Sequence, residues 1–410
     1  MPGLVKYLHL FGWQPIILTP SLYLRPDRKF RAVETPYRDA LSFWKRLFGL
    51  KQDESLRMRL KKQFGVTSKR SLIDLIFNVG GEIINYPDIY KGWQPFAVKA
   101  GAEFLQKEKV DAILSSSSPV TSHLIARELK IKHKIPWVAD FRDLWSQNHD
   151  YQYSFLRRLR DRRLELKTLS MADALVTVSE LWAEKLRGLH RGKSVFSITN
   201  GFDPEEVNIP PANLTPKFTI TYTGTIYTGK QDPTKLFEVL RDLVLEKSVE
   251  PGDVEVRFYG TKLAWLDKEI KRYGLSDVVK QYGHVAKEVA LEKQKESHLL
   301  LLLDWDDPNE KGVYSGKVFE YLGARRPILA IGGSIGDVVH KLLIETKAGI
   351  QATNLPTAKK VLVKLYQEYK LKGKVVYNGI EGELNKYSHR EMASKFSEIF
   401  DHLTNTSVGS

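Results

Sequence analysis

Short apolar runs alternate with amphipathic stretches along most of the chain. The runs are rich in Ile, Leu and Val, which is typical of buried strands, and stretches with helical periodicity lie between them, as at 233–247 and 357–369. Repeated strand–helix alternation predicts an α/β fold with parallel sheets covered by helices on both faces. The predicted strands are 15–18, 111–115, 137–140, 174–178 and 195–199 in the first half, and 218–222, 254–259, 279–282, 299–303, 327–331 and 349–351 in the second.

The first twenty residues predict a helix followed by a strand. Leu4, Val5 and Leu8 place apolar side chains on one helical face, Gly12 ends the helix, and residues 15–18 have the composition of a buried strand. A nucleotide-binding α/β domain usually begins with a strand and a Gly-rich turn. The order at the start of this chain is therefore unusual.

A stretch rich in Pro and Asn at 203–216 interrupts the alternation and predicts a linker. Because 410 residues are too many for one ordinary core, we expect two domains. Residues 1–205 and 206–385 are each expected to form a Rossmann-like doubly wound domain, and the two domains are expected to face each other across a cleft. Residues 386–410 are expected to form a helix and tail. The amphipathic pattern of this helix does not decide which domain it covers.

Composition excludes several classes of site and location. The chain has no cysteine, which excludes disulfides and thiolate chemistry. No apolar run reaches the roughly 18 residues of a membrane span, and no signal peptide is visible. We therefore expect a cytoplasmic protein.

The formal net charge of +14 suits nucleic acid, an anionic membrane or phosphorylated substrates. From Tyr37 to Arg70, ten Lys or Arg residues stand against three acids, with aromatic residues between them. This pattern favours a segment lying on an anionic membrane at the inner face of the cell. Its alternative is an apolar stripe that packs inward. No nucleic-acid motif is present, so we expect no nucleic-acid partner.

A second basic block spans Phe155 to Lys167. It fits either an interfacial helix or a helix with an inward apolar stripe and solvated arginines. We interpret Leu156, Leu159 and Leu166 as the core stripe of such a helix.

Two stretches of the second half are candidates for binding phosphate. In "YTGTIYTGKQDPTKL", a strand leads through Gly224 and Lys230 into a helix, whose first N–H groups and lysine suit an anion. In "YSGKVFEYLGARRPILA", Lys317 and Glu320 are three residues apart on one helical face. Such a pair is commonly a surface ion pair, but a lysine can also face a diphosphate and a glutamate can accept from ribose hydroxyls.

The first half offers two further candidates. "PWVADFRDLW" ends a strand with Asp140, Arg142 and Asp143, which either face the ligand crevice or form an internal ion pair. "SSSSPVTSHLIA" places Ser118 in a turn and His123 on the following helix, where the serines can also act only as a cap. No nucleophile elbow is present, which argues against a serine hydrolase. The acids of "LLDWDDPNE" lack convincing metal spacing, so we expect neither a metal nor a cofactor.

Together these stretches resemble a family 4 glycosyltransferase with the GT-B fold, in the bacterial branch that decorates surface polysaccharides. The resemblance is carried in order by "FGWQPIILTP", "YPDIYKGWQPFAVKAG", "SSSSPVTSHLIA", "PWVADFRDLW", "ADALVTVSE", "ITNGFD", "YTGTIY" and "KVFEYLGARRPILA". It implies a retaining hexosyl transfer, without a metal, from a nucleotide-diphosphate sugar to a lipid-linked or polysaccharide acceptor.

The resemblance also implies roles for particular residues. The donor-binding residues would be Gly224, Lys230, Lys317, Glu320, Asn200 and Gly201, the catalytic residues Arg142, Asp143 and Asp140, and the acceptor-side residues Ser118 and His123. Two positions depart from the family pattern: Gly312 stands where a first glutamate is expected, and Thr225 where an arginine is expected. Lys317 can replace the lost positive charge.

The family usually begins with a strand and glycine loop that are absent before "LVKYLHLFGW". We expect that the natural start lies upstream, or else that the protein is truncated. A sugar-nucleotide epimerase of similar fold and a non-catalytic protein that binds nucleotide sugars or anionic polymers are the alternative functions.

Overall fold

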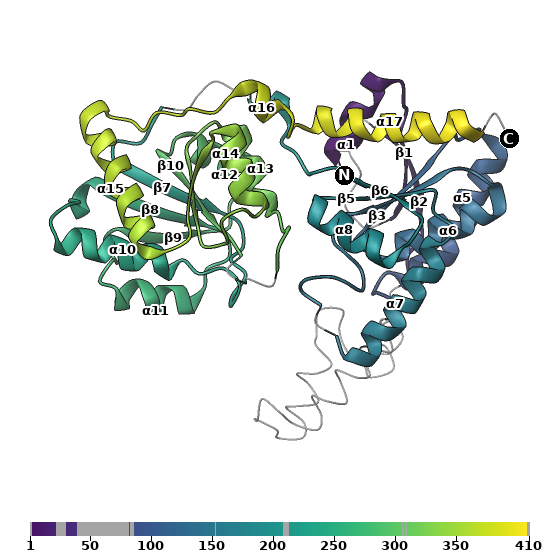
Figure 1. The fold of residues 1–410 in the computed structure, drawn as a ribbon, viewed down its shortest axis with the longest axis horizontal. Helices are drawn as coiled ribbons and strands as arrows, with labels where there is room; N and C mark the ends of the chain where they lie inside the picture. The colour runs from purple at the N-terminus through teal and green to yellow at the C-terminus, as the bar shows by residue number, and fades with distance from the viewer. Residues whose placement is uncertain are drawn as a thin grey trace. The chain divides into compact units, whose positions relative to one another are not determined.

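The structure, a computed structural model, describes residues 2–21, 30–38, 82, 86–151, 153–207, 213–305, 307 and 310–407. The chain divides into two compact units (Figure 1). Unit 1 contains Leu8–Ile198 and Lys395–Ser410, and unit 2 contains Pro2–Tyr7 and Thr199–Ser394. The predicted linker begins just inside unit 2, and its residues 208–212 lie outside the described ranges.

Unit 1 is built on parallel strands joined by helices. Its strands are β1 (Ile16–Pro20), β2 (Arg31–Thr35), β3 (Ile113–Ser117), β4 (Trp137–Phe141), β5 (Ala174–Thr177) and β6 (Ser194–Ser197). Its helices are η1 (Leu8–Phe11), η2 (Lys91–Trp93), α5 (Gln94–Lys107), α6 (Thr121–His133), α7 (Phe155–Leu169) and α8 (Glu180–Leu189), together with most of α17 (His389–Ser407). The five strands predicted for this half are present, with ends shifted by at most a few residues.

Two separate sheets make up the strand layer of unit 1. β3, β4, β5 and β6 pair in that order, while β1 pairs with β2 alone. The predicted burial of the first strand is wrong: Ile16 is exposed and its neighbours on β1 are only partly buried. The reason is that β1 has one strand partner, which the sequence pattern had not predicted. Leu18 of β1 and Ile113 of β3 nevertheless pack on one cluster beneath α5 and α6.

The prediction for the second basic block is also wrong. Leu156, Leu159 and Leu166 are exposed on α7, and the buried side of this helix is polar. Asp161 pairs with Arg157 at 3.1 Å and accepts from the Tyr151 hydroxyl at 2.6 Å. One helical turn further along α7, four residues after Asp161, Glu165 accepts from Ser146 and lies 3.2 Å from His190 Nε2. This internal network fixes the polar face inward and turns the leucines outward.

Unit 2 is a six-stranded parallel sheet in the order β12-β11-β10-β7-β8-β9. Its strands are β7 (Phe218–Thr223), β8 (Val254–Tyr259), β9 (Val279–Gly283), β10 (Leu299–Leu303), β11 (Ile328–Ile331) and β12 (Gly349–Ala352). Renumbered within the unit, this is the 3-2-1-4-5-6 order of the Rossmann fold. The strand order reverses between β7 and β10, so the carboxyl ends of these two strands mark the expected ligand crevice.

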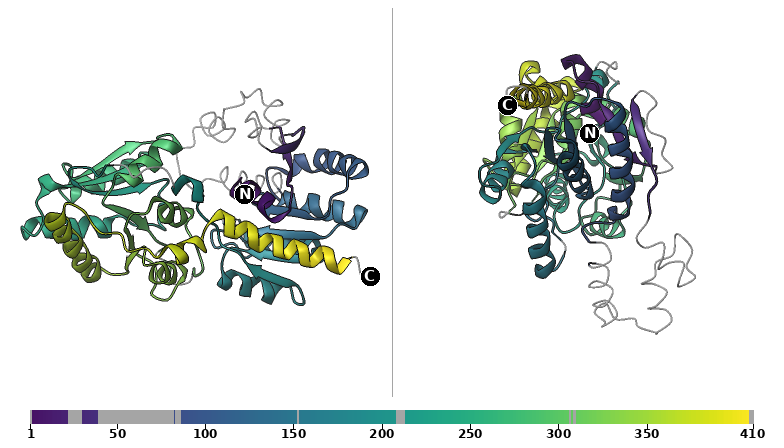
Figure 2. Two further views of the ribbon diagram at one scale, coloured as in Figure 1. Left: turned by 90° about the horizontal axis from the view of Figure 1, so that it is seen from above. Right: turned by 90° about the vertical axis from the view of Figure 1, so that its right-hand side faces the viewer.

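Helices cover both faces of this sheet (Figures 1 and 2). They are α10 (Thr234–Leu245), α11 (Ala264–Arg272) and α15 (Leu355–Lys372) on one face, and α12 (Lys287–Lys295), α13 (Gly316–Ala324) and α14 (Val338–Thr346) on the other. Short helices α1 (Pro2–Tyr7), α9 (Pro204–Val207), η3 (Pro251–Asp253) and α16 (Glu381–Asn385) complete the unit. All five leucines of β10 are buried, which is why this strand appears in the sequence as an unbroken apolar run.

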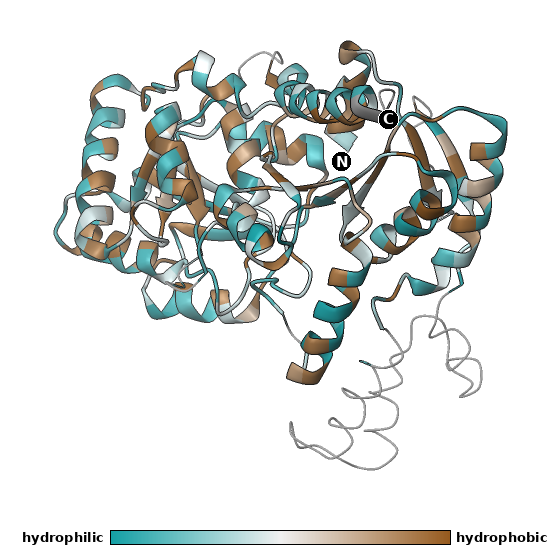
Figure 3. Ribbon diagram, turned by 45° about the vertical axis from the view of Figure 1, so that its right-hand side comes forward, coloured by the Kyte–Doolittle hydropathy of each residue, from teal (hydrophilic) through white to brown (hydrophobic). Residues whose placement is uncertain are grey.

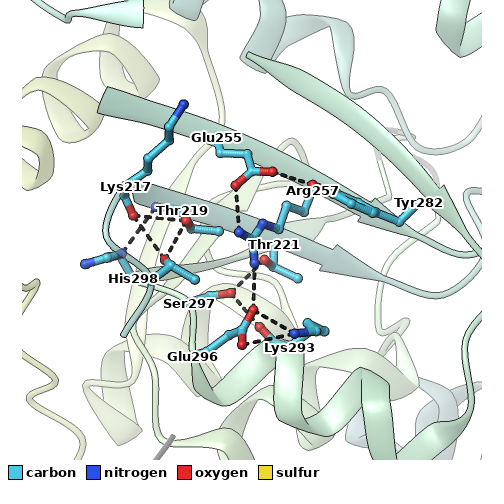
Figure 4. Close-up of polar contacts among 11 residues, drawn as sticks. Lys217, Thr219, Thr221, Glu255, Arg257, Tyr282, Lys293, Glu296, Ser297 and His298 are labelled. Atoms are coloured by element: carbon cyan, nitrogen blue, oxygen red, sulfur yellow. Dashed lines mark hydrogen bonds and ion pairs between the residues drawn. The ribbon is translucent and has the colours of Figure 1, made fainter. Parts of the chain in front are cut away.

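A polar layer lies between β7, β8 and the end of α12 (Figure 4). Alternate residues Phe218, Ile220 and Tyr222 enter the apolar core, so Thr219 and Thr221 face the other way. Arg257 on β8 binds Glu255 and Glu296, each at 2.6 Å. Glu255 is the second residue of β8 and Glu296 precedes β10, so this network lies before the carboxyl ends that mark the ligand crevice and belongs to the framework.

Residues near both ends of the chain make hydrogen bonds within the two units. In unit 2, Lys6 Nζ and the Tyr7 hydroxyl donate to Asp203 at 2.8 and 2.6 Å. In unit 1, Trp13 Nε1 donates to Asp401 at 3.0 Å, and the Trp13 ring contacts Phe400. Most of the terminal helix α17 therefore packs with the first half of the chain, which the sequence left open. None of the helices in the described ranges combines the length and hydropathy needed to cross a bilayer.

Candidate functional site

The turn after β7 is the centre of the candidate donor site in unit 2. β7 ends at Thr223, and Gly224 follows with φ +104°, a left-handed conformation that suits glycine. A Cβ atom at Gly224 would lie 2.6 Å from Lys317 Cε, so the Lys317 side chain passes directly over the Gly224 backbone. The predicted residues Gly224 and Lys317, distant in sequence, are therefore in contact.

Two lysines approach this turn over a pair of aromatic rings. Lys317 Nζ donates to the Thr225 carbonyl at 3.1 Å and lies 5.7 Å from the centre of the Tyr227 ring. Lys230 Nζ lies 5.4 Å from the centre of the Trp305 ring. The Tyr227 and Trp305 rings contact each other at 6.0 Å between centres. Both cations thus belong to one cluster at the strand-order reversal.

The aromatic members of this cluster were not predicted. Tyr227 is half exposed in the turn after β7, and Trp305 follows β10 directly. The position of Trp305 at the carboxyl end of a buried strand was a usable signal, because such positions line the crevice of a Rossmann fold. Asp307 is one of the acids of "LLDWDDPNE", whose spacing did not predict a metal site, and its carboxylate lies 3.7 Å from Lys230 Nζ.

Glu320 and Lys317 share the first part of α13 but make different contacts. Burial lowers the pKa of Lys317, and the nearby Glu320 carboxylate opposes that shift. Protein atoms crowded around the Glu320 carboxylate raise its pKa, although the residue has an exposed surface. Gln294 Nε2 lies 3.5 Å from Glu320 Oε2 and donates to Thr223 Oγ1 at 2.9 Å. Gln294 therefore links the carboxylate of Glu320 to the end of β7.

The backbone conformation at position 312 explains why glycine stands there in place of the glutamate of the family pattern. Its φ is +84°, and its N–H donates to Asp337 Oδ1 at 3.0 Å. A glutamate at this position would have to adopt a positive φ, which residues other than glycine rarely do. The loop before α13 is therefore shaped for glycine and not for the glutamate of the family pattern.

Asn200 and Gly201 lie at the beginning of unit 2. A Cβ atom at Gly201 would lie 2.7 Å from the Tyr387 carbonyl oxygen, so glycine allows two backbone segments to cross. Phe202 N–H donates to the same carbonyl at 3.0 Å, and His389 N–H donates back to Phe202 at 2.8 Å. Close backbone packing thus accounts for Gly201 without a ligand.

In unit 1, Asp140 and Arg142 form an internal ion pair. Arg142 Nε lies 2.9 Å from both carboxylate oxygens of Asp140, which is fully buried and also accepts from Ser116 Oγ at 2.8 Å. Arg142 Nη1 donates to the Ile198 carbonyl at 3.0 Å. This is the internal pairing that the sequence left open as an alternative.

Asp143 and Ser118 lie near that pair in the fold of unit 1 but are exposed. Asp143 follows the end of β4, and desolvation by neighbouring groups raises its pKa. Ser118 lies in the turn between β3 and α6. The Asp143 carbonyl accepts from Ser117 Oγ at 3.3 Å, which joins the two carboxyl-end loops.

His123 is placed differently from the expectation. Its ring is fully buried between α6 and the sheet, with Nδ1 2.8 Å from Ser115 Oγ and the Phe141 ring 4.6 Å away. Burial lowers the pKa of His123 to about 4, so the ring is neutral at physiological pH. The His123 ring is therefore a core group of unit 1 that is not exposed to an acceptor.

The structure thus groups the predicted residues unevenly. Gly224, Lys230, Lys317 and Glu320 surround the carboxyl end of β7, while Asp140, Arg142, Asp143 and Ser118 lie at the carboxyl ends of β3 and β4. Across the described ranges, no group of three or more His, Asp or Glu side chains has the arrangement of a metal site. Asp306, one of the acids considered from the sequence, lies outside those ranges.

Comparison with known proteins gives a family match for the first half of the chain and a fold match for nearly all of it. Residues 2–196 match the model of the glycosyl transferase 4-like domain. No curated protein matches the chain.

Solved structures match over nearly the whole length. The Anabaena protein HepE in complex with UDP and glucose has 12% identity and a TM-score of 0.58, with 95% of this chain and 100% of HepE covered. Sucrose-phosphate synthase from Thermosynechococcus elongatus has 12% identity and a TM-score of 0.58, with coverage of 98% and 92%. The lipopolysaccharide outer core galactosyltransferase WaaB in its apo form has 13% identity and a TM-score of 0.54, with coverage of 98% and 94%.

At these identities the solved structures establish the fold, and the family match covers the first half of the chain. The Rossmann strand order of unit 2, which the family match does not cover, agrees with that fold. Residues 2–196 therefore match a glycosyl transferase 4-like domain, and the chain as a whole has the GT-B fold of the solved structures.

Proposed function

We propose that the protein transfers a hexosyl group, with retention of configuration, from a nucleotide-diphosphate sugar to a lipid-linked or polysaccharide acceptor. The observation that carries this proposal is the pair of lysines, Lys230 and Lys317, at the carboxyl end of β7. HepE, which shares the fold, was solved with UDP and with UDP-glucose. A nucleotide diphosphate is therefore the leaving group that we assign to this turn.

The chemistry follows from the charge that develops on the leaving diphosphate. Breaking the bond between the sugar and the diphosphate leaves negative charge on the phosphate oxygens, and fixed cations there stabilise the transition state. Lys230 and Lys317 supply this charge without a metal ion in the proposed mechanism. Glu320, held beside Gln294, accepts from the ribose hydroxyls and so positions the nucleotide.

The resting contacts of the two lysines support this role. Lys317 donates to a backbone carbonyl, and Lys230 lies near Asp307 and over Trp305. A phosphate oxygen would be a stronger acceptor than a carbonyl, because both partners then carry charge. The cluster can therefore exchange internal contacts for contacts with the donor.

The acceptor is assigned to unit 1. Asp143 and Ser118 present polar groups at carboxyl-end loops, and Arg142 with Asp140 fixes the adjacent backbone. We propose that the acceptor is reached at the inner face of the cell membrane. The basic segment Tyr37–Arg70, from which we inferred membrane association, lies almost entirely outside the described residues.

A non-catalytic nucleotide-sugar binding protein is the second candidate. The observation in its favour is Gly312, since the loop that would present the family's first glutamate is shaped for glycine. Such a protein would bind the donor but would neither transfer nor hydrolyse its sugar. The proposed transferase and this alternative therefore differ in products and not in donor affinity.

The test is a product assay with a panel of nucleotide-diphosphate sugars and lipid-linked or oligosaccharide acceptors. Lys230→Ala and Lys317→Ala should each weaken donor binding by about 10- to 150-fold, the usual effect of losing a charged hydrogen bond. Lys268→Ala, at an exposed position on α11, is the matched control. NMR of the glycoside formed with the active donor should show the donor's anomeric configuration.

Donor binding without any product across the panel would favour the binding protein. An inverted anomer would contradict retention. Equal donor affinity in Lys230→Ala, Lys317→Ala and Lys268→Ala would reject the assignment of the site.

A further inference from the structure

α7 of unit 1 exposes an apolar stripe that no described element covers. Phe155, Leu156, Leu159 and Leu166 are 72%, 73%, 41% and 38% exposed. At 100° per residue, Phe155, Leu159 and Leu166 fall within a narrow sector of the helix surface, and Leu156 lies beside them. In Figure 3, α7 carries alternating brown and teal bands, and its end farthest from the sheet is brown. Single exposed leucines are ordinary, but an aligned row of this kind marks an interaction surface.

Basic side chains border the stripe on both sides. Arg158 and Arg162 lie along one flank, Arg160, Arg163 and Lys167 lie along the other, and all five are exposed. The structure describes the whole of α7, and both acids of this helix, Asp161 and Glu165, are buried. The outward surface of α7 is therefore apolar and cationic, with no exposed carboxylate of its own.

The inward contacts explain why the helix holds this orientation. Asp161 is bound by Arg157 and the Tyr151 hydroxyl, and Glu165 by Ser146 and His190. Rotating the leucines inward would carry Asp161 and Glu165 to the surface and leave the buried Ser146 and His190 without these partners. The internal network thus keeps the leucines at the surface.

We propose that this face of α7 docks on an anionic lipid bilayer, with Phe155, Leu159 and Leu166 in the headgroup–acyl boundary. An apolar stripe flanked by Arg and Lys is the pattern of a helix that lies in the membrane interface. Charge complementarity selects the anionic bilayer over a second copy of the chain, because a copy would bring the same five cations against these five. The docking surface itself does not depend on the proposed function. The benefit of docking does rest on that function, because docking would hold unit 1 at a surface that carries the lipid-linked acceptor.

The experiment is sedimentation of the full chain with phosphatidylcholine vesicles, prepared with and without phosphatidylglycerol. The wild type should bind the anionic vesicles and release at high salt. Arg162→Glu with Arg163→Glu should lower the partition coefficient by at least about 30-fold, since each basic residue at the surface contributes about fivefold. The matched control is Lys268→Glu with Lys271→Glu, a pair of exposed lysines on α11.

A second pair of variants tests the apolar stripe without changing charge. Leu159→Ser with Leu166→Ser should lower binding about tenfold or more, because less apolar area enters the interface. Ile344→Ser with Leu371→Ser replaces two exposed apolar residues of unit 2, 63% and 84% exposed, and should bind as the wild type does. Circular dichroism spectra and thermal unfolding should be the same in all four double variants and the wild type, which would show that both units are folded.

Three outcomes would overturn the proposal. In the first, the wild type binds neutral and anionic vesicles equally. In the second, both α7 double variants bind as the wild type does. In the third, the protein forms a stable dimer in solution that Leu159→Ser with Leu166→Ser dissociates. Failure of sugar transfer with vesicle binding that depends on α7 would count against the proposed function and leave the docking surface in place.

Discussion

At the residue scale, the same residue types serve either the framework or the site according to their contacts. Lys317 and Lys230 meet at an exposed turn of unit 2, where their charges are available to a ligand. His123 and Asp140 are enclosed in unit 1, where His123 Nδ1 contacts Ser115 Oγ and Asp140 pairs with Arg142. Sequence alone grouped all of these as candidate site residues, because burial of a polar side chain depends on contacts between distant segments.

The buried His123 should make unit 1 sensitive to acid. Its pKa is about 4 in the folded chain, against about 6.5 for an unfolded chain, so between these values the unfolded state binds more protons. Stability should therefore fall as pH decreases from 6.5 to 4, with a contribution from His123 of about 3 kcal/mol over that range. His123→Gln, which can still contact Ser115 but does not titrate, should show a shallower fall.

The measurement is urea unfolding followed at several pH values for the wild type and His123→Gln. His284→Gln makes the same exchange at an exposed position of unit 2 and should keep the wild-type pH dependence. A wild-type slope that His123→Gln leaves unchanged would show that this ring does not govern the response to acid.

At the element scale, strands were predicted more securely than helix orientation. The β10 run of five leucines and the Val254–Tyr259 strand have the predicted bounds, because continuous or alternating apolar runs are local signals. β2 was missed since its short sequence has little apolar pattern and its stability comes from pairing with β1. α7 was predicted as a helix with the wrong face inward. Amphipathicity defines two faces, and only the partners of Asp161 and Glu165 decide which one is buried.

Within unit 2, Arg257 should hold β8 to the end of α12. Arg257→Met would leave Glu255 and Glu296, both largely buried, without their shared cation. We expect a loss of about 2–4 kcal/mol in the free energy of unfolding, somewhat below the value for a fully buried pair because all three side chains keep some solvent contact. Adding Glu255→Gln and Glu296→Gln should recover part of this loss.

Thermal and urea unfolding check this expectation. Arg272→Met, at an exposed position on α11, removes the same charge from a surface pair and should change stability by less than about 1 kcal/mol. If Arg257→Met were no more destabilising than Arg272→Met, the polar layer of Figure 4 would not contribute to the framework as we describe.

At the scale of the whole molecule, strand order is the feature that connects fold to function. The strand-order reversal between β7 and β10 selects one crevice in unit 2. Four of the six residues predicted to bind the donor lie beside it, namely Gly224, Lys230, Lys317 and Glu320, and Asn200 and Gly201 do not. The sequence allowed this placement because each candidate followed a predicted strand or began the next helix. It did not reveal Tyr227 and Trp305, whose roles depend on the packing of two loops that are far apart in the chain.

The central claim is that the turn after β7 binds a diphosphate through Lys230 and Lys317. The most direct test is calorimetric titration with UDP, UMP and uridine, which share a base and ribose and differ only in phosphate groups. The wild type should bind UDP at least about tenfold more tightly than UMP, because the second phosphate adds a charged contact.

In the double variant Lys230→Ala with Lys317→Ala, this preference for UDP over UMP should largely disappear, while the double variant Lys268→Ala with Lys271→Ala on α11 should keep it. An undiminished preference for UDP in the Lys230→Ala with Lys317→Ala variant would contradict the account, since the diphosphate would then be bound elsewhere.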